Sequence, residues 1–252
     1  MKRIAIMQAR TTSTRLPRKV LLRLFEKTVV EHIITRVQAA KLVDGVCVAT
    51  TTNTTDDEVA TIAQACGASV YRGSENDVLD RFYQAAQQEQ ADVVIRITAD
   101  DPFKDPAVID QIVQTFEWSG LDYVSNTLRP TYPEGIDVEV FSMKALVRAW
   151  QEATIPSEHE HVTPYIWKHP DRFQIRNVEY RENLSKMRWT LDKPEDWVFI
   201  QQVYDALYPK KPLFLMEDIL QLLHERPFLA ALQSATVRNE GYLKSIAEER
   251  NL

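Results

Sequence analysis

Short apolar runs alternate with amphipathic stretches from residue 3 to residue 118. The apolar run at 3–8 is followed by a polar, basic stretch and then by residues 29–40, whose apolar positions recur with a helical period. The same alternation predicts strands over 46–50, 69–71 and 92–98, and helices over 56–66, 77–88 and 106–118. Strands that alternate with helices in this way predict an α/β fold, with a mostly parallel sheet and helices on both faces.

The alternation stops after residue 124. An alternating strand is predicted over 136–141, followed by helices over 143–153 and 159–168 and strands over 173–178 and 187–191. From Pro194 onward the pattern is mainly helical, with further helices near 218–223 and 240–250. We therefore expect a single domain over 1–252, with a small inserted lobe at 128–180 for the acceptor and for dimerisation, and a helical C-terminal part at 194–252.

The composition of the 252 residues, 44% hydrophobic and 26% charged, is typical of a globular protein. The chain holds six glycines, and their positions allow neither a GxGxxG dinucleotide motif nor a GxxxxGK[ST] phosphate loop. No apolar run approaches the ~18 residues of a membrane span. We expect a cytoplasmic protein with no membrane contact, in which Cys47 and Cys66 are reduced thiols.

Charge is distributed unevenly along the chain. The net charge is −6, which argues against general nucleic-acid binding, yet residues 1–24 contain seven basic side chains and no acidic one. A solvated surface is one interpretation. The more specific interpretation is an anion site, because Arg10, Arg15 and Lys19 follow the first predicted strand. Ligands of parallel sheets bind at the carboxyl ends of the strands. Such a cluster suits a polyphosphate.

Two aspartates follow predicted strands in distant parts of the chain. Asp100 comes after the strand at 92–98, and Asp192 comes after the strand at 187–191. Helix capping is one explanation, because Asp105 precedes Pro106 and Asp192 lies two residues before Pro194. The other explanation is a magnesium site, since Mg²⁺ is typically bound by one or two carboxylates together with substrate phosphates.

Six segments follow one another in the order and nearly the spacing of the cytidylyltransferase family: QARTTSTRLPRKVL, VYRGSENDVLDRF, RITADDPFKDP, PEGIDVEVFS, EHVTPYI and RWTLDKPEDW. From residue 3 to about residue 200 the chain resembles this family of CMP-sugar synthetases, most strongly its SpsF-like branch of spore coat polysaccharide biosynthesis. The resemblance implies a Rossmann-like nucleotide-diphospho-sugar transferase fold. It also implies Mg²⁺-dependent transfer of CMP from CTP to a sugar acid or related surface-glycan precursor, with release of pyrophosphate.

The resemblance also implies roles for single residues. The catalytic set would be Arg10, Arg15 and Lys19, which would bind the triphosphate, and Asp100 and Asp192, which would hold Mg²⁺. The nucleotide would further contact Gln8, Ala9, Ser13, Arg72, Ser74, Asp77 and Arg81. The acceptor would face Asp137, Glu139 and His161. The general base stays open, and the expected partners are CTP, a small-molecule acceptor and a second copy of the chain.

The chain departs from the family pattern at three positions. Thr12, Arg18 and Ala99 stand where the family often has glycine, which predicts a stiffer and more basic loop. Two alternative functions stay open: nucleotidyl transfer from another nucleoside triphosphate to a phosphorylated acceptor, and nucleotide binding without catalysis. The pair His159 and His161 would need further ligands to form a zinc site, and a helix start capped by Ser157 is the plainer interpretation of this segment.

Overall fold

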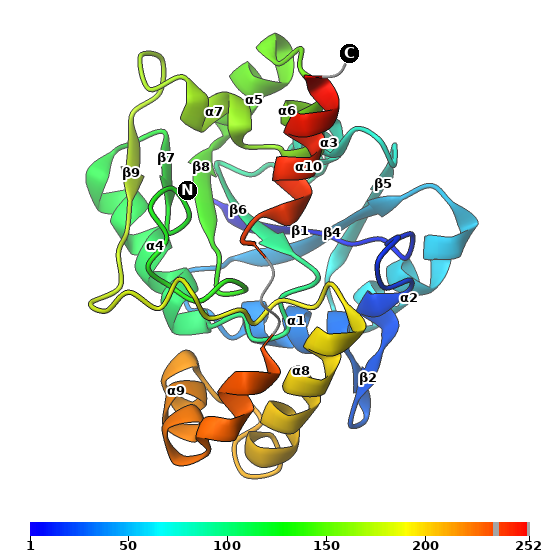
Figure 1. Ribbon diagram of the computed structural model, residues 1–252. Coiled ribbons are helices and arrows are strands. Elements are labelled where there is room, and N and C mark those ends of the chain that lie inside the picture. The colour runs from blue at the N-terminus through cyan, green and yellow to red at the C-terminus, as the bar shows by residue number, and fades with distance from the viewer. Residues whose placement is uncertain (234–236, 251–252) are drawn as a thin grey trace.

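The computed structural model describes residues 1–233 and 237–250, and its centre is a seven-stranded sheet (Figure 1). In spatial order the strands are β5 (Ser69–Gly73), β4 (Gly45–Thr51), β1 (Arg3–Gln8), β6 (Val93–Thr98), β8 (Glu139–Ser142), β7 (Tyr123–Ser125) and β9 (Ile175–Asn177). Among these strands only β8 runs antiparallel to its neighbours. The predicted α/β fold with a mostly parallel sheet is confirmed.

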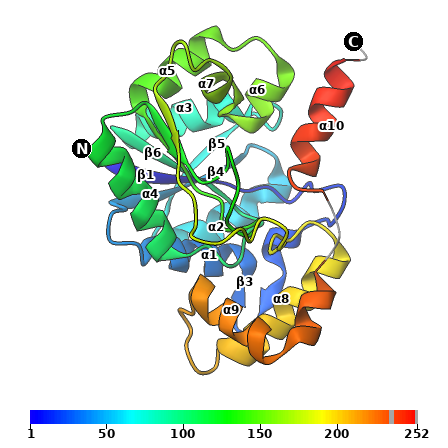
Figure 2. The ribbon, with the colours of Figure 1, turned by 60° about the vertical axis from the view of Figure 1, so that its left-hand side comes forward.

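Helices cover both faces of the sheet (Figure 2). The first face packs on α1 (Val29–Gln38), α2 (Asp57–Ala65) and α4 (Pro106–Ser119), and α8 (Pro194–Leu207) and α9 (Met216–Glu225) extend the same apolar cluster beyond α1 (Figure 2). The second face packs on α3 (Val78–Gln88), α5 (Met143–Glu152), α6 (Pro156–His161) and α7 (Pro164–Lys168). Strand β1 serves both layers, because Ala5 and Met7 point to the first and Ile4 and Ile6 to the second.

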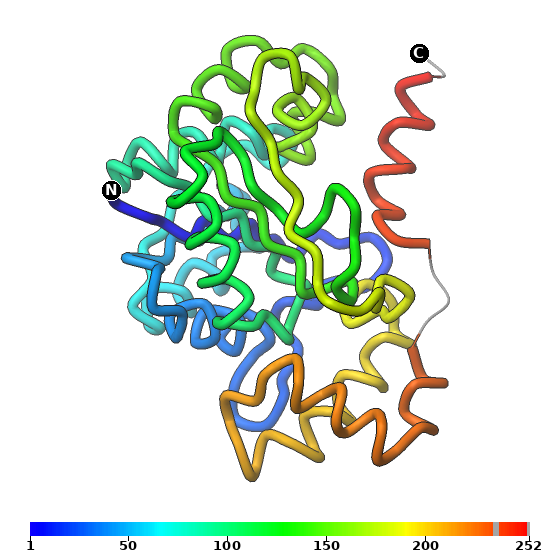
Figure 3. Tube along the Cα trace, turned by 90° about the vertical axis from the view of Figure 1, so that its left-hand side faces the viewer, coloured from blue at the N-terminus to red at the C-terminus, as the bar shows by residue number. Residues whose placement is uncertain are grey.

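Smaller elements complete the fold. A hairpin of β2 (Arg23–Leu24) and β3 (Lys27–Thr28) follows the 3₁₀ turn η1 (Lys19–Leu21), and η2 (Thr54–Asp56) leads into α2. The turn η3 (Pro227–Leu232) packs on α8 and α9, whereas α10 (Glu240–Glu249) lies beside α6 (Figures 1 and 3). None of the helices within 1–233 and 237–250 is long and apolar enough to cross a membrane.

Residues 128–180 contribute two strands, β8 and β9, to the main sheet, together with α5, α6 and α7. Strand β8 begins at Glu139, later than predicted, and pairs with β6 so that Glu139 lies opposite Arg96. Because β8 is antiparallel, its amino end meets the carboxyl ends of β1 and β6 at one edge of the sheet. Loops from the middle of the chain therefore reach the edge where ligands of parallel sheets bind.

The strand predicted at 187–191 is wrong. This segment forms one isolated bridge, between Glu134 and Arg188, because its backbone pairs with two different loops. The amide of Trp189 donates to the carbonyl of Glu134, whereas the amide of Leu191 donates to the carbonyl of Asp100. The segment therefore joins two loops at the edge of the sheet.

The single helix predicted at 159–168 is two helices, α6 and α7. Val162 lies between them with φ of 71°, and Pro164, which has no amide proton, begins the second helix. The prediction that Ser157 caps the helix is also wrong. Helix α6 begins at Pro156, and the amide and hydroxyl of Ser157 contact Glu249 of α10.

Gly135 is required where the loop before β8 meets the segment at 187–191. Its φ is 103°, and an added Cβ would lie 2.8 Å from the carbonyl carbon of Trp189 and 3.0 Å from the amide nitrogen of Thr190. We expect Gly135→Ala to lower the free energy of unfolding by about 3 kcal/mol, measured by denaturant titration. Gly120→Ala is the control: φ there is 63° but no atom lies within 4 Å, so the loss should be about 1 kcal/mol. Equal losses would contradict the close approach at Gly135.

Candidate active site

A cavity of about 970 Å³ lies at the carboxyl ends of β1 and β6. Most of the predicted site residues line it: Gln8, Ala9, Arg10, Ser13, Arg15, Lys19, Arg81, Asp100, Asp137, Glu139, His161 and Asp192. They come from the N-terminal loop, from the ends of the central strands and the loop before β8, from α3 and α6, and from the segment before α8. The cavity therefore brings together residues that lie far apart in the sequence, from Gln8 to Asp192.

Three residues predicted to contact the nucleotide do not line this cavity: Arg72, Ser74 and Asp77. Arg72 is turned toward η2, where its guanidinium donates to the carbonyls of Thr51 and Asn53. The other two support the wall from behind. The backbone carbonyl of Ser74 accepts a hydrogen bond from Arg81, and the carboxylate of Asp77 caps α3. The hydroxyl of Ser74 accepts from the amide of Asn76, at 3.3 Å, so the side chains of Arg72, Ser74 and Asp77 all serve local structure. The sequence pattern did not distinguish this role from contact with a ligand.

The ammonium group of Lys19 joins the two predicted metal ligands. Its Nζ lies 2.8 Å from Asp100 Oδ2 and 2.7 Å from Asp192 Oδ1. Burial lowers the pKa of Lys19, but the two carboxylates outweigh burial and raise it. Burial raises the pKa of Asp100, and here the charge and hydrogen bond of Lys19 prevail and bring that pKa down to about 2. Lys19 and Asp100 are therefore both charged at neutral pH.

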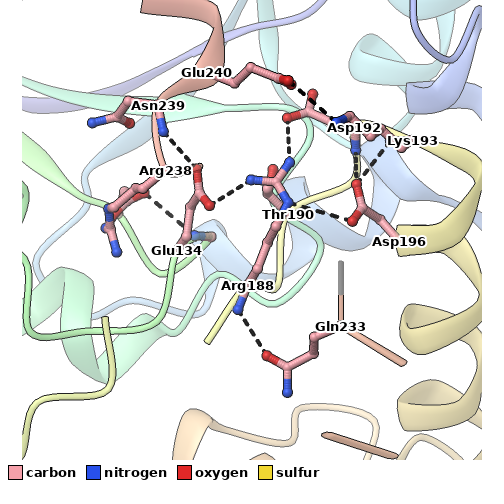
Figure 4. Close-up of polar contacts among 12 residues, drawn as sticks. Glu134, Arg188, Thr190, Asp192, Lys193, Asp196, Gln233, Arg238, Asn239 and Glu240 are labelled. Atoms are coloured by element: carbon pink, nitrogen blue, oxygen red, sulfur yellow. Dashed lines mark hydrogen bonds and ion pairs between the residues drawn. The ribbon is translucent and has the colours of Figure 1, made fainter. Parts of the chain in front are cut away.

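Asp192 is surrounded by cations. Its Oδ1 lies 2.9 Å from Arg15, and its Oδ2 accepts a hydrogen bond of 2.9 Å from the buried guanidinium of Arg188 (Figure 4). The capping explanation for Asp192 is wrong, because the carboxylate of Asp196 accepts from the amides of residues 192 and 193 at the start of α8. Because Asp196 caps the helix, the carboxylate of Asp192 is not used as a cap and faces the cavity.

Capping does explain another of the acidic residues. Asp105 accepts hydrogen bonds from the amides of Ala107 and Val108 at the start of α4, at 2.8 and 3.3 Å, as predicted. Asp100, five residues earlier, caps no helix, and its carboxylate reaches Lys19. Asp100 and Asp105, two of the three aspartates of the TADDPFKD segment, therefore have different roles.

The N-terminal loop is held by side-chain hydrogen bonds in place of glycines. The buried carboxylate of Asp56 accepts from both the amide and the hydroxyl of Thr11, at 2.8 and 2.6 Å. Arg10 pairs with Glu75 at 3.1 Å. Arg18 adopts left-handed backbone with φ of 57°, in the position where the family often has glycine, at a cost of about 1 kcal/mol. The loop thus keeps the shape that glycine favours while adding a positive charge.

The far half of the cavity contains the predicted acceptor residues, each already engaged within the protein. Glu139 pairs with Arg96 and accepts hydrogen bonds from Tyr123 and Thr163. Asp137 pairs with Arg238, which precedes α10. Nε2 of His161 lies 3.0 Å from the hydroxyl of Ser245 on α10, and burial lowers the pKa of His161 to about 4. His161 is therefore neutral at pH 7.

The two carboxylates suit a hard cation that prefers oxygen ligands. Within the described part of the chain no group of three or more His, Cys, Asp and Glu side chains could hold a metal ion alone. The protein would therefore supply only Asp100 and Asp192, and substrate oxygens would have to complete the shell, which fits Mg²⁺. The two histidines of the H-x-H pair diverge, because His159 turns to Asp77, 3.1 Å away, while His161 faces the cavity.

Sequence reasoning missed several residues that organise the site. Arg188 and Arg96 each open a segment that the resemblance rests on, but neither was assigned a role, although a basic residue beside a predicted metal ligand is a usable signal. Glu134 pairs with Arg188 at 2.5 Å. Arg238 and Glu240 contact the site from beyond the stretch covered by the resemblance, and no motif marked them.

A mostly parallel sheet with a cationic loop and two aspartates at its carboxyl edge is the arrangement of a Rossmann-like nucleotidyltransferase. The family model described as "Cytidylyltransferase" matches residues 4–235, and the chain belongs to this family of enzymes. It is 32% identical to the spore coat polysaccharide biosynthesis protein SpsF of Bacillus subtilis, over 91% of this chain and 97% of that protein.

Two further relatives cover nearly the whole chain. An uncharacterized protein of Methanocaldococcus jannaschii is 35% identical over 96% of this chain and 98% of its own length. A solved structure of a cytidylyltransferase from Leptospira borgpetersenii superposes with a TM-score of 0.88 and 29% identity, covering 95% of this chain and 100% of that chain. The similarity therefore extends through the helical C-terminal part, beyond the motifs quoted above.

Proposed function

We propose that this enzyme transfers CMP from CTP to a sugar acid or a related surface-glycan precursor, with Mg²⁺ and release of pyrophosphate. The observation that carries the proposal is that Lys19, in the basic N-terminal loop, contacts both Asp100 and Asp192. A cation placed between two carboxylates marks a position where positive charge is required. Family membership supports CTP as the nucleotide, and the similarity to SpsF supports a polysaccharide precursor as the product.

The triphosphate would lie along the N-terminal loop. Arg15 and Lys19 already contact a carboxylate there, and phosphate oxygens are ligands of the same kind for these groups. Arg10 lines the same space. Gln8 and Ala9, at the end of β1, would lie against the base or the ribose, and Arg81 would close the wall behind them. The chain thus holds the nucleotide mainly by cationic side chains.

In the proposed reaction an acceptor hydroxyl loses its proton to water, and its oxygen bonds to the α-phosphorus of CTP. The bond from that phosphorus to the oxygen bridging the β-phosphate breaks in line, and pyrophosphate leaves. Arg10, Arg15 and Lys19 would neutralise the charge that develops on the leaving group. Mg²⁺, held by Asp100 and Asp192 together with phosphate oxygens, would supply further neutralisation when bound.

The acceptor would occupy the half of the cavity near Asp137, Glu139 and His161. Because His161 is neutral at pH 7 and its pKa is about 4, it can share hydrogen bonds with hydroxyl groups without adding charge. A homodimer and a cytoplasmic location are part of the same proposal, and both rest on the resemblance and on composition.

The test is pyrophosphate release, assayed with CTP, UTP, GTP and ATP, each with Mg²⁺ and a panel of acceptors that includes 3-deoxy-octulosonic and acylneuraminic acids and sugar phosphates. We expect release with CTP and a sugar acid. Release only with another nucleotide and a sugar phosphate would favour the alternative nucleotidyltransferase. Binding of CTP by calorimetry without turnover of any acceptor would favour a nucleotide-binding protein that lacks catalysis.

A further inference from the structure

Helix α10 forms one wall of the cavity although it is the last helix of the chain. The cavity-lining residues of this wall are Asn239, Glu240, Gly241, Tyr242, Lys244, Ser245 and Glu248. Figures 2 and 3 show α10 at the side of the molecule, next to α6 and away from α8 and α9. The contacts between α10 and the rest of the protein hold this wall in place, and their chemical type determines how easily α10 moves away from the cavity.

Helix α10 is held by polar pairs and by one aromatic side chain, Tyr242, whose ring packs edge-on against the rings of His161 and Trp167. No residue of Glu240–Glu249 is buried, whereas each of the helices α1 to α9 contributes buried side chains. The C-terminal half of the helix is attached through Ser245 to His161 and through Glu249 to Ser157. Polar contacts on a partly exposed surface exchange readily with water and ions, so the polar part of this attachment is of a kind that an added anion can replace.

The N-terminal end of α10 is bound to the cations of the proposed triphosphate site. The carboxylate of Glu240 pairs with Arg15 and lies 3.3 Å from Nζ of Lys193 (Figure 4). The Glu240 carboxylate therefore occupies Nη1 of Arg15, while Nη2 of the same guanidinium lies 2.9 Å from Asp192. A phosphate oxygen and this carboxylate are alternative ligands for one guanidinium.

We propose that α10 is a lid closed by Glu240, and that the phosphates of an incoming nucleotide displace Glu240 from Arg15 and release the lid. This proposal rests on the proposed function, because it takes Arg15 as a triphosphate ligand. The lid then responds to phosphates and not to the base. A nucleoside without phosphates leaves Glu240 on Arg15, whereas pyrophosphate, which carries the same charged groups as the end of CTP, is enough to open it.

The first experiment compares CTP binding by calorimetry in the full-length wild type and two variants, Glu240→Gln and Glu248→Gln. Both glutamates lie on α10 and line the cavity, but within 1–233 and 237–250 the ion pair of Glu248 is with Lys244 of its own helix, at 3.7 Å. We expect Glu240→Gln to bind CTP about three- to tenfold more tightly, because the competing carboxylate is lost, and Glu248→Gln to match the wild type. An equal gain in both variants would reduce the effect to general charge and overturn the lid.

The second experiment follows hydrogen exchange of the backbone amides of 240–249 in the wild type. We expect CTP and pyrophosphate each to speed exchange in α10 and cytidine to leave it unchanged, and we expect Glu240→Gln to exchange fast before any addition. Slower exchange with CTP would mean that α10 closes on the nucleotide, and the proposal would be wrong.

Failure of the lid and failure of the proposed function give different results. If neither the wild type nor Glu240→Gln binds CTP, the triphosphate assignment is wrong and the competition at Arg15 falls with it. If the wild type binds CTP and Glu240→Gln binds it with the same affinity, only the lid is wrong and the proposed function stands.

Discussion

Replacing Asp100 with asparagine should lower kcat/KM for CTP by about a hundredfold or more, while leaving the protein folded. The side chain keeps its size and can still accept a hydrogen bond from Lys19, which lies 2.8 Å away. Its negative charge is lost, and with it the ligand strength that Mg²⁺ requires. The measurement is pyrophosphate release at saturating acceptor over a range of Mg²⁺ concentrations. Half-maximal activity should shift to higher Mg²⁺ in this variant.

Asp192→Asn should have an effect of similar size on turnover, with an added loss of stability. The buried guanidinium of Arg188 donates to this carboxylate, and in the variant it would keep Glu134 and, 3.5 Å from its Nε, Asp196. The matched control is Glu195→Gln, which removes a charge from an exposed position three residues further along. Full activity in either aspartate variant, or an equal loss in Glu195→Gln, would remove the basis for assigning these carboxylates to the metal.

The sequence predicted the first half of the fold well, and with it the proximity of the residues that follow β1 and β6, because both depend on local order. Parallel strands with alternating helices place the residues after β1 and β6 at one edge, so the proximity of Lys19 and Asp100 follows from strand periodicity. The aspartates were harder to assign, since a carboxylate beside a proline is compatible with a cap and with a ligand. Only the structure showed that Asp196 caps α8 in place of Asp192.

The remainder of the site could not be predicted from local patterns. The segment at 187–191 alternates like a strand, yet its hydrogen bonds go to the loops at Glu134 and Asp100, which lie far away in the chain. Helix α10 is amphipathic in sequence, but its place beside α6 is set by pairs such as Ser245 with His161. Such polar contacts between distant residues leave no periodic signal, so Glu240 and Arg238 stayed outside the predicted site.

Lys19→Ala should damage CTP use at least as strongly as the aspartate variants and should also destabilise the enzyme. Nζ of Lys19 separates the carboxylates of Asp100 and Asp192. Without it, two like charges face each other in a partly buried site. We expect the free energy of unfolding at pH 7 to fall by about 2 kcal/mol, less than for an isolated buried pair, because Asp192 keeps Arg15 and Arg188.

The dependence of this loss on pH and on Mg²⁺ separates it from simple truncation of a side chain. The pKa of Asp100 is about 2 in the folded enzyme and about 4 in an unfolded chain, so its pairing with Lys19 stabilises the fold above pH 4 and ceases to do so as the pH falls toward 2. The difference in stability between the wild type and Lys19→Ala should therefore be largest near neutrality and should shrink over that range.

In denaturant titrations at pH 7, Mg²⁺ should stabilise Lys19→Ala more than the wild type, because the cation no longer competes with an ammonium group. Arg23→Ala, at an exposed arginine of the same basic stretch, should show neither effect. A difference in stability that is independent of pH and of Mg²⁺ would mean that Lys19 contributes only its packing, and that the two carboxylates do not form a cation site.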